Sequence, residues 1–156
     1  SVTFIIQHHH TIQQRYTEPA NPTVHANGVT GIFSLSLAVR DAPAAAEAWG
    51  RILGLVLDEP VEDEADRLKT VHLSLGNCHL EFVSTTGEGA LARHLAANGE
   101  SPYLLSLRVA DLDRCAAQLT TRGVSLGPLR QTPGGLRRAV SADQTEGVNL
   151  ELVQPV

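Results

Sequence analysis

Part of this chain repeats itself 70 positions later, and this internal repeat limits the possible folds more than any other feature. The string FSLSLAVRDAPAAAEAW aligns without gaps with YLLSLRVADLDRCAAQL, so that Ser36 matches Ser106. The same offset relates Glu81 to Glu151 near the end of each half. An offset that holds from the start to the end of both halves indicates a duplicated structural unit.

Each half has the pattern of a strand, a helix and three more strands. Apolar and small residues alternate over 33–39, as in a half-buried strand, and Asp41 can cap a helix that Gly54 ends. Further strands are expected near 55–57, 69–75 and 78–83, and the second half predicts a strand at 103–109, a helix at 111–122 and strands near 124–130, 136–141 and 147–153. The acidic run EPVEDEADR reads as a loop. The sequence predicts two βαβββ modules, 33–83 and 103–154, joined by a linker helix at 88–98.

The dipeptide Gly76-Asn77 predicts a tight turn inside the first module. With a two-residue turn, His72 lies directly across the strand pair from Glu81, with Cβ atoms about 4.5–5.5 Å apart. The turn therefore places an imidazole beside a carboxylate.

Alternation along the strands divides the side chains between a helix-packed face and a concave face. The bulky odd-numbered residues of 33–39, Phe33 among them, are expected to pack on the helix. The side chains left for the concave face are Ser34, Ser36, Ala38, Leu104, Ser106, Arg108, His79, Glu81, Asn149 and Glu151. One of Arg137 and Arg138 is expected there as well. We therefore predict a cleft in which the two glutamates face one another and the serines, Leu104, Arg108 and Asn149 contact a small substrate.

Composition and charge exclude several classes of protein. The chain is 42% hydrophobic and 19% charged, as in ordinary globular proteins, and its net charge of −5 argues against nucleic-acid binding. It contains no apolar run long enough for a membrane span. Two cysteines without a CxxC motif favour a reducing compartment, so we expect a cytoplasmic protein. The lack of methionine predicts a processed product, a trimmed chain or a fragment of a longer protein.

The duplication and four local strings resemble the vicinal oxygen chelate superfamily, which includes glyoxalase I, methylmalonyl-CoA epimerase and bleomycin-resistance proteins. The strings are SLAVRDAPAAAEAW, LSLGNCHLEFV, ALARHLAANGE and GVNLELVQP, and the likeness to the epimerase branch covers roughly Phe33 to Gln154. The resemblance implies an α+β fold, in which the tandem modules form a curved, barrel-like mixed sheet with helices on its convex side. It also implies a concave face that holds a divalent metal and the substrate.

The metal ligands of this family come from the first and last strands of each module. The last-strand positions match Glu81 and Glu151, and His72 is a candidate replacement ligand for Mn, Co, Ni, Zn or Fe. The first-strand positions, usually histidine in the epimerases, match Ser34 and Leu104, and leucine cannot bind a metal. Without a metal, the two facing carboxylates are expected to raise each other's pKa.

For several of these residues, a purely structural role is an alternative to the functional one. Glu81 and Glu151 serve as ligand or general base, or else form ion pairs with Arg108 as partner. His72 is a metal ligand, or a strand histidine bonded to Glu81. Residues 1–32 are interpreted as a strand, VTFIIQ, and a connector, which end a preceding module; the strand should pair with a sheet edge. A metal site at His8, His9, His10 and His25 is disfavoured, because a triple histidine in a connector binds metals adventitiously.

Two function classes remain. The first is an isomerase or lyase that moves a proton next to the carbonyl of a small carbonyl or thioester substrate, with Glu81 and Glu151 as catalytic residues and with or without a bound metal. The second is a metal-free binding or resistance module, or a non-catalytic domain of a larger glyoxalase-like protein. The expected protein partner is a second copy, as a homodimer, or a second glyoxalase-like domain.

Overall fold

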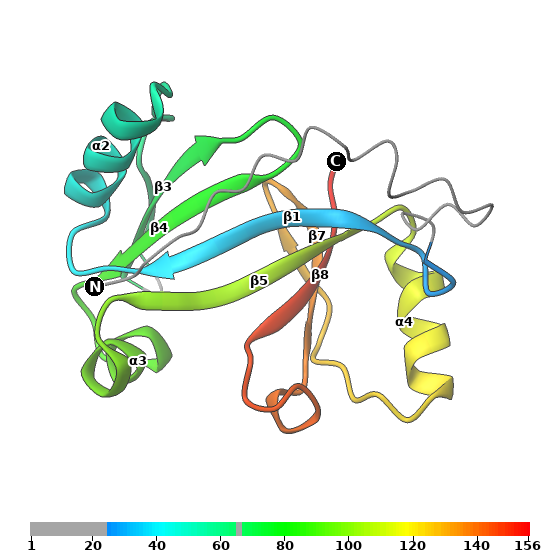
Figure 1. Cartoon of the computed structure of the whole chain (residues 1–156). Coiled ribbons are helices and arrows are strands. Elements are labelled where there is room, and N and C mark those ends of the chain that lie inside the picture. The colour runs from blue at the N-terminus through cyan, green and yellow to red at the C-terminus, as the bar shows by residue number, and fades with distance from the viewer. Residues whose placement is uncertain (1–24, 65–66) are drawn as a thin grey trace, which may run out of the picture.

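The structure is a computed structural model that describes residues 25–64 and 67–156 (Figure 1). The first module contains β1 (Val29–Ala38), α2 (Ala42–Leu53), β2 (Val61–Asp63), β3 (Leu68–Ser74) and β4 (His79–Thr85). The linker forms α3 (Ala90–Asn98). The second module contains β5 (Ser101–Val109), α4 (Leu112–Thr121), β6 (Arg130–Thr132), β7 (Gly135–Val140), the short 3-10 helix η1 (Ala142–Gln144) and β8 (Leu150–Gln154). Both predicted βαβββ modules are therefore confirmed.

One mixed sheet, in the order β2-β3-β4-β1-β5-β8-β7-β6, contains all of these strands and curls into a half-barrel. The antiparallel pair of β1 and β5 crosses the middle of the molecule (Figure 1). Leu35 pairs there with Leu105, its equivalent in the repeat, while Ser34 pairs with Ser106. An approximate twofold axis through the Leu35–Leu105 pair thus relates the two modules, and the predicted α+β class is confirmed.

The helices begin and pack as the sequence predicts. The carboxylates of Asp41 and Asp111 accept hydrogen bonds from the third backbone N–H after each, which caps α2 and α4. On the side of the sheet away from the glutamates, α2 covers a core that includes Leu80 and Phe82. Around α4, a second cluster consists of Val109, Leu112, Cys115 and Leu152. Burial on this face of the sheet supplies the hydrophobic stabilisation of each module.

The linker helix α3 packs elsewhere. Its Leu91 and Leu95 contact Ala38 and Val83, whose side chains alternate with those of the α2 core. This helix therefore closes one end of the face that carries Glu81. Within the described residues, no helix has the length and apolar character needed to span a membrane.

Four details differ from the expectation. The segments expected as strands at 55–57 and 124–130 form only isolated bridges, Leu57 with Leu73 and Leu126 with Val140, and β2 and β6 take their places in the modules. The acidic run forms β2, because Val61 to Asp63 pair with β3 and extend the sheet edge. The first strand already begins at Val29, since it continues alongside the end of β5. A register shift between Ile32 and Ser34 takes Phe33 out of the alternation, so the prediction that Phe33 packs on the helix is wrong. The predicted strand at 2–7 and the histidines at 8–10 lie outside the described residues.

Gly135 allows the close pairing of β7 with β8. Its φ is +128°, and an added Cβ would lie 2.1 Å from the carbonyl oxygen of Gln154. We predict that Gly135→Ala lowers the free energy of unfolding by more than about 2 kcal/mol, because the backbone must shift. Gly31→Ala is the matched control: its Cβ meets nothing within 4 Å, so a change of less than about 1 kcal/mol is expected. Equal urea midpoints for the two variants would contradict this account.

Candidate functional site

Each module places a buried serine–glutamate pair on the same face of the sheet. The parallel pairing of β1 with β4 sets Ser36 beside Glu81, and Ser36 Oγ donates to Glu81 Oε2 at 2.5 Å. The pairing of β5 with β8 repeats this arrangement, with Ser106 Oγ donating to Glu151 Oε1 at 2.7 Å. The two glutamates are only 6% and 1% exposed. The duplication therefore preserves a hydroxyl donor for each buried carboxylate.

In the first module, the basic neighbour of the glutamate is a histidine. His72 pairs with Glu81 across β3 and β4 as predicted, and its Nε2 lies 3.5 Å from Glu81 Oε1. Burial raises the pKa of Glu81, but hydrogen bonds from His72 and Ser36, with the charges of His72 and Arg137, outweigh it and lower the pKa below its ordinary value. The expectation that this pKa is raised is therefore wrong, because the carboxylate faces cationic partners.

In the second module, two arginines take the place of the histidine. Arg137 Nη1 donates to Glu151 Oε1 at 2.5 Å, and Arg130 Nη2 lies 3.8 Å from Glu151 Oε2. Arg137 is thus the member of the Arg137-Arg138 pair that faces the glutamates. Arg108, the partner expected from the sequence, instead donates to the carbonyl of Asn77 at 2.9 Å.

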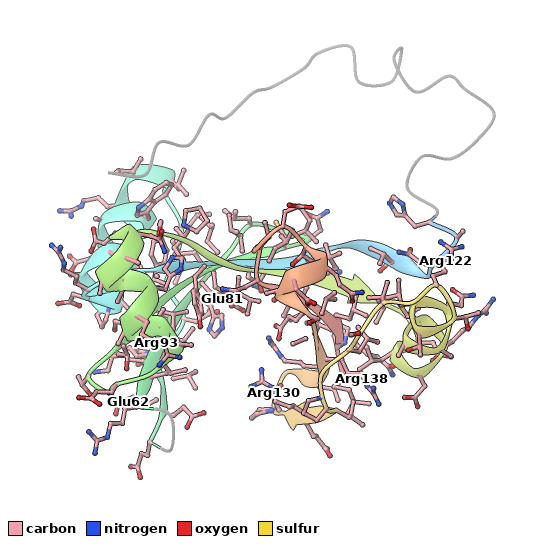
Figure 2. The ribbon with its side chains drawn as sticks, turned by 90° about the horizontal axis from the view of Figure 1, so that it is seen from below. Glu62, Glu81, Arg93, Arg122, Arg130 and Arg138 are labelled. Carbon is pink, nitrogen blue, oxygen red and sulfur yellow. The ribbon has the colours of Figure 1, made fainter. Side chains whose placement is uncertain are left out.

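Glu81 lines a cavity of about 660 Å³ between the two modules. In Figure 2 it lies between the hairpin that carries Glu62 and the hairpin that carries Arg130. The first module contributes Phe33, Asp58, Val61, Asp63, Leu68, Thr70, His72, His79 and Glu81, and the second contributes Arg130, Gln131, Thr132, Pro133, Gly134 and Arg137. We call this cavity the cleft.

Phe33 forms an aromatic surface in the cleft. The guanidinium carbons of Arg108 and Arg137 lie 5.6 and 5.5 Å from the centre of its ring. The His79 ring packs against it at 5.6 Å. The two cation–π contacts hold both arginines near the cleft.

The other predicted substrate contacts have different surroundings. Ser34 is fully buried, and its Oγ has no hydrogen-bond partner in the part of the chain that the structure describes. Leu104 and Asn149 line a neighbouring pocket of about 190 Å³ together with Arg130 and Glu151. Asn149 also donates to the carbonyl of Tyr103 at 2.9 Å. The predicted substrate contacts are therefore not among the residues that line the cleft, and two of them line the neighbouring pocket instead.

The divalent metal that the resemblance implies does not fit the residues present. Both oxygens of Glu151 face arginine, and both oxygens of Glu81 face Ser36 or His72. Among residues 25–64 and 67–156, no three His, Cys, Asp or Glu side chains gather as a metal site. Of the predicted metal ligands, His72 and Glu81 therefore lie together, whereas Glu151 is not grouped with them.

Sequence reasoning missed Arg130 and the pairing of Arg137 with Glu151. Ala139, and not a cationic residue, lies directly across from Glu151, whereas Arg137 pairs with Val153. A signal was present, since Arg130, Arg137 and Arg138 stand close together in the strands before Glu151. The register needed to use it depends on a connection whose length the sequence leaves open.

Solved structures resemble this fold closely. Methylmalonyl-CoA epimerase from Mycobacterium tuberculosis is 23% identical with a TM-score of 0.79, and the match covers 86% of this chain and 94% of that chain. A Streptomyces coelicolor methylmalonyl-CoA epimerase variant in complex with 2-nitronate-propionyl-CoA is 23% identical with a TM-score of 0.75, covering 82% and 99%. A hypothetical protein from Bacillus halodurans C-125 is 16% identical with a TM-score of 0.73, covering 80% and 94%. No curated protein matches the chain.

At this level of identity, the solved structures show the fold. The family follows from a separate match, in which the family model described as Glyoxalase/Bleomycin resistance protein/Dioxygenase superfamily covers residues 35–140. This span includes the last four residues of β1, all of β5, both main helices and Glu81. The chain belongs to the glyoxalase/bleomycin resistance protein/dioxygenase superfamily.

Proposed function

We propose that this chain is an epimerase- or glyoxalase-like domain that binds a small carbonyl or thioester compound in the cleft and moves a proton on the carbon next to the carbonyl. The observation that carries this proposal is Glu81, a buried carboxylate that lines a cavity of about 660 Å³. Solved relatives of this fold include a methylmalonyl-CoA epimerase in complex with methylmalonyl-CoA, a thioester. The superfamily and the site thus favour the same class of substrate.

In this proposal Glu81 is the base. Its lowered pKa keeps it ionised at neutral pH, so it is ready to accept a proton. The proton passes from the substrate carbon to the carboxylate, and the C–H electron pair moves into an enolate. Return of a proton to that carbon completes an isomerisation, whereas expulsion of a leaving group from the neighbouring carbon completes a lyase reaction.

His72 and Ser36 are positioning residues for this step. Ser36 donates a hydrogen bond to Glu81 Oε2, and His72 lies beside the other oxygen, Oε1. Phe33 and Leu68 provide apolar contact for the body of the substrate. The surroundings of Glu151 differ, because its carboxylate is bound by Arg137, so Glu81 is the better base of the two.

A second function, a metal-free binding or resistance module, is favoured by that same Arg137–Glu151 pair. A carboxylate that is buried and paired with arginine is suited to holding a cation in place, not to accepting a proton. In this alternative the cleft retains a ligand unchanged. The cytoplasmic location, and a partner that is a second copy or a second glyoxalase-like domain, stay predictions.

Proton exchange in D₂O separates the two functions. We predict that the protein exchanges the α-proton of methylmalonyl-CoA or a related acyl-CoA thioester, and that Glu81→Gln slows exchange by about 10²–10⁴-fold because the base is lost. Loss of the α-proton signal in ¹H NMR measures the rate. Glu47→Gln, on the exposed face of α2, is the charge-matched control and should exchange as the unaltered protein does. Binding of such thioesters without any exchange would favour the binding module.

The pH dependence of stability tests the ionisation of Glu81. Because its pKa is lowered in the folded state, Glu81 contributes stability that is present above its ordinary value of 4.5 and is lost as the pH falls through the folded value. We predict that the free energy of unfolding drops more steeply between pH 5 and pH 3 in the unaltered protein than in Glu81→Gln. Urea denaturation at several pH values measures this. A steeper drop in Glu81→Gln would show that the pKa is raised instead.

A further inference from the structure

Arg137 places a positive charge between the two modules. Its guanidinium donates to Glu151 of the second module at 2.5 Å, and its side chain lines the same cleft as Glu81 of the first module. The side chain is 16% exposed, and it projects from β7, where Arg137 pairs with Val153. One guanidinium therefore pairs with Glu151 and faces the cavity that Glu81 lines.

The groups around Glu151 are arranged for the guanidinium of Arg137 and leave no place for a metal ion. Ser106 shares Glu151 Oε1 with Arg137, while Arg130 lies near Oε2. A divalent ion placed among these groups would meet the positive charge of both arginines, and the repulsion is strong where solvent is excluded. The ring of Phe33, under the Arg137 guanidinium, further restricts its movement.

We infer that Arg137 supplies, between Glu81 and Glu151, the positive charge that a divalent ion would otherwise supply, and that with Arg130 it receives a carboxylate or enolate oxygen of the ligand. This inference rests on the proposed function in taking the same cleft as the ligand site. An arginine is suited to the task, because its planar fork can bind a protein carboxylate and a ligand oxygen at once.

Spare donors are available for that oxygen. Arg130 is 61% exposed and reaches into both cavities.

Two titrations of the melting temperature test the inference. The first adds Mn²⁺, Co²⁺, Ni²⁺ or Zn²⁺, and the second adds malonate as a small carboxylate probe. All proteins carry His8, His9 and His10 changed to Gln, so that this run binds no metal. The variants are Arg137→Met and, as matched control, Arg138→Met, whose position pairs with the core residue Leu152 on the same strand pair.

The expected responses of the two variants are opposite. The protein with Arg137 should be stabilised by malonate and not by the metals, as should Arg138→Met. Arg137→Met should lose the malonate response and gain a metal response, because Glu81, Glu151 and His72 are then free to bind an ion. Adding Glu151→Gln to Arg137→Met should remove that gain.

A metal-dependent rise in melting temperature of the protein with Arg137 intact, abolished by Glu81→Gln, would overturn the inference. This measurement needs no variant at position 137 and so remains decisive if Arg137→Met does not fold. A folded Arg137→Met that retains the malonate response would overturn it too. Both titrations measure binding alone, so their failure is distinct from a failure of proton exchange.

Discussion

The burial of Glu81 and Glu151 is the constraint on which the rest of the site depends. A buried carboxylate without compensation costs several kcal/mol, and here two of them lie on one face of one sheet. The duplicated βαβββ unit solves the first part of this problem twice, with Ser36 and Ser106. A hydroxyl supplies one hydrogen bond but no charge, so each carboxylate has a basic side chain beside it as well.

The two modules place different basic side chains beside their glutamates, and the cleft is asymmetric as a result. In the first module, His72 stands directly across from Glu81. In the second, Ala139 stands across from Glu151, and the cation comes from Arg137, two residues earlier on β7. The long arginine side chain spans this offset. The first module thus contributes His72 to the cleft, while the second contributes the guanidinium groups of Arg130 and Arg137, which attract the anionic end of a ligand.

The sequence predicts the parts of this arrangement that depend on the repeat and on a tight turn, but not those that depend on a bulge or a long connection. The offset of 70 and the turn at Gly76-Asn77 predict the modules, the glutamate face and the pairing of His72 with Glu81, because repeats and two-residue turns define register. The bulge that turns Phe33 into the cleft leaves no mark in the alternation. The partners of Glu151 depend on the connection through η1, which separates β7 from β8 by more residues than the turn between β3 and β4. The repeat therefore predicts the position of Glu151 but not its pairing with Arg137.

The central claim, that an arginine is the cation between the two glutamates, is tested most directly by diffraction. Crystals grown with Mn²⁺ and measured for anomalous scattering would show where the ion binds. The account predicts no anomalous peak between Glu81 and Glu151, and electron density for the Arg137 guanidinium in contact with Glu151. A peak that is coordinated by both glutamates, with Arg137 displaced from them, would contradict it.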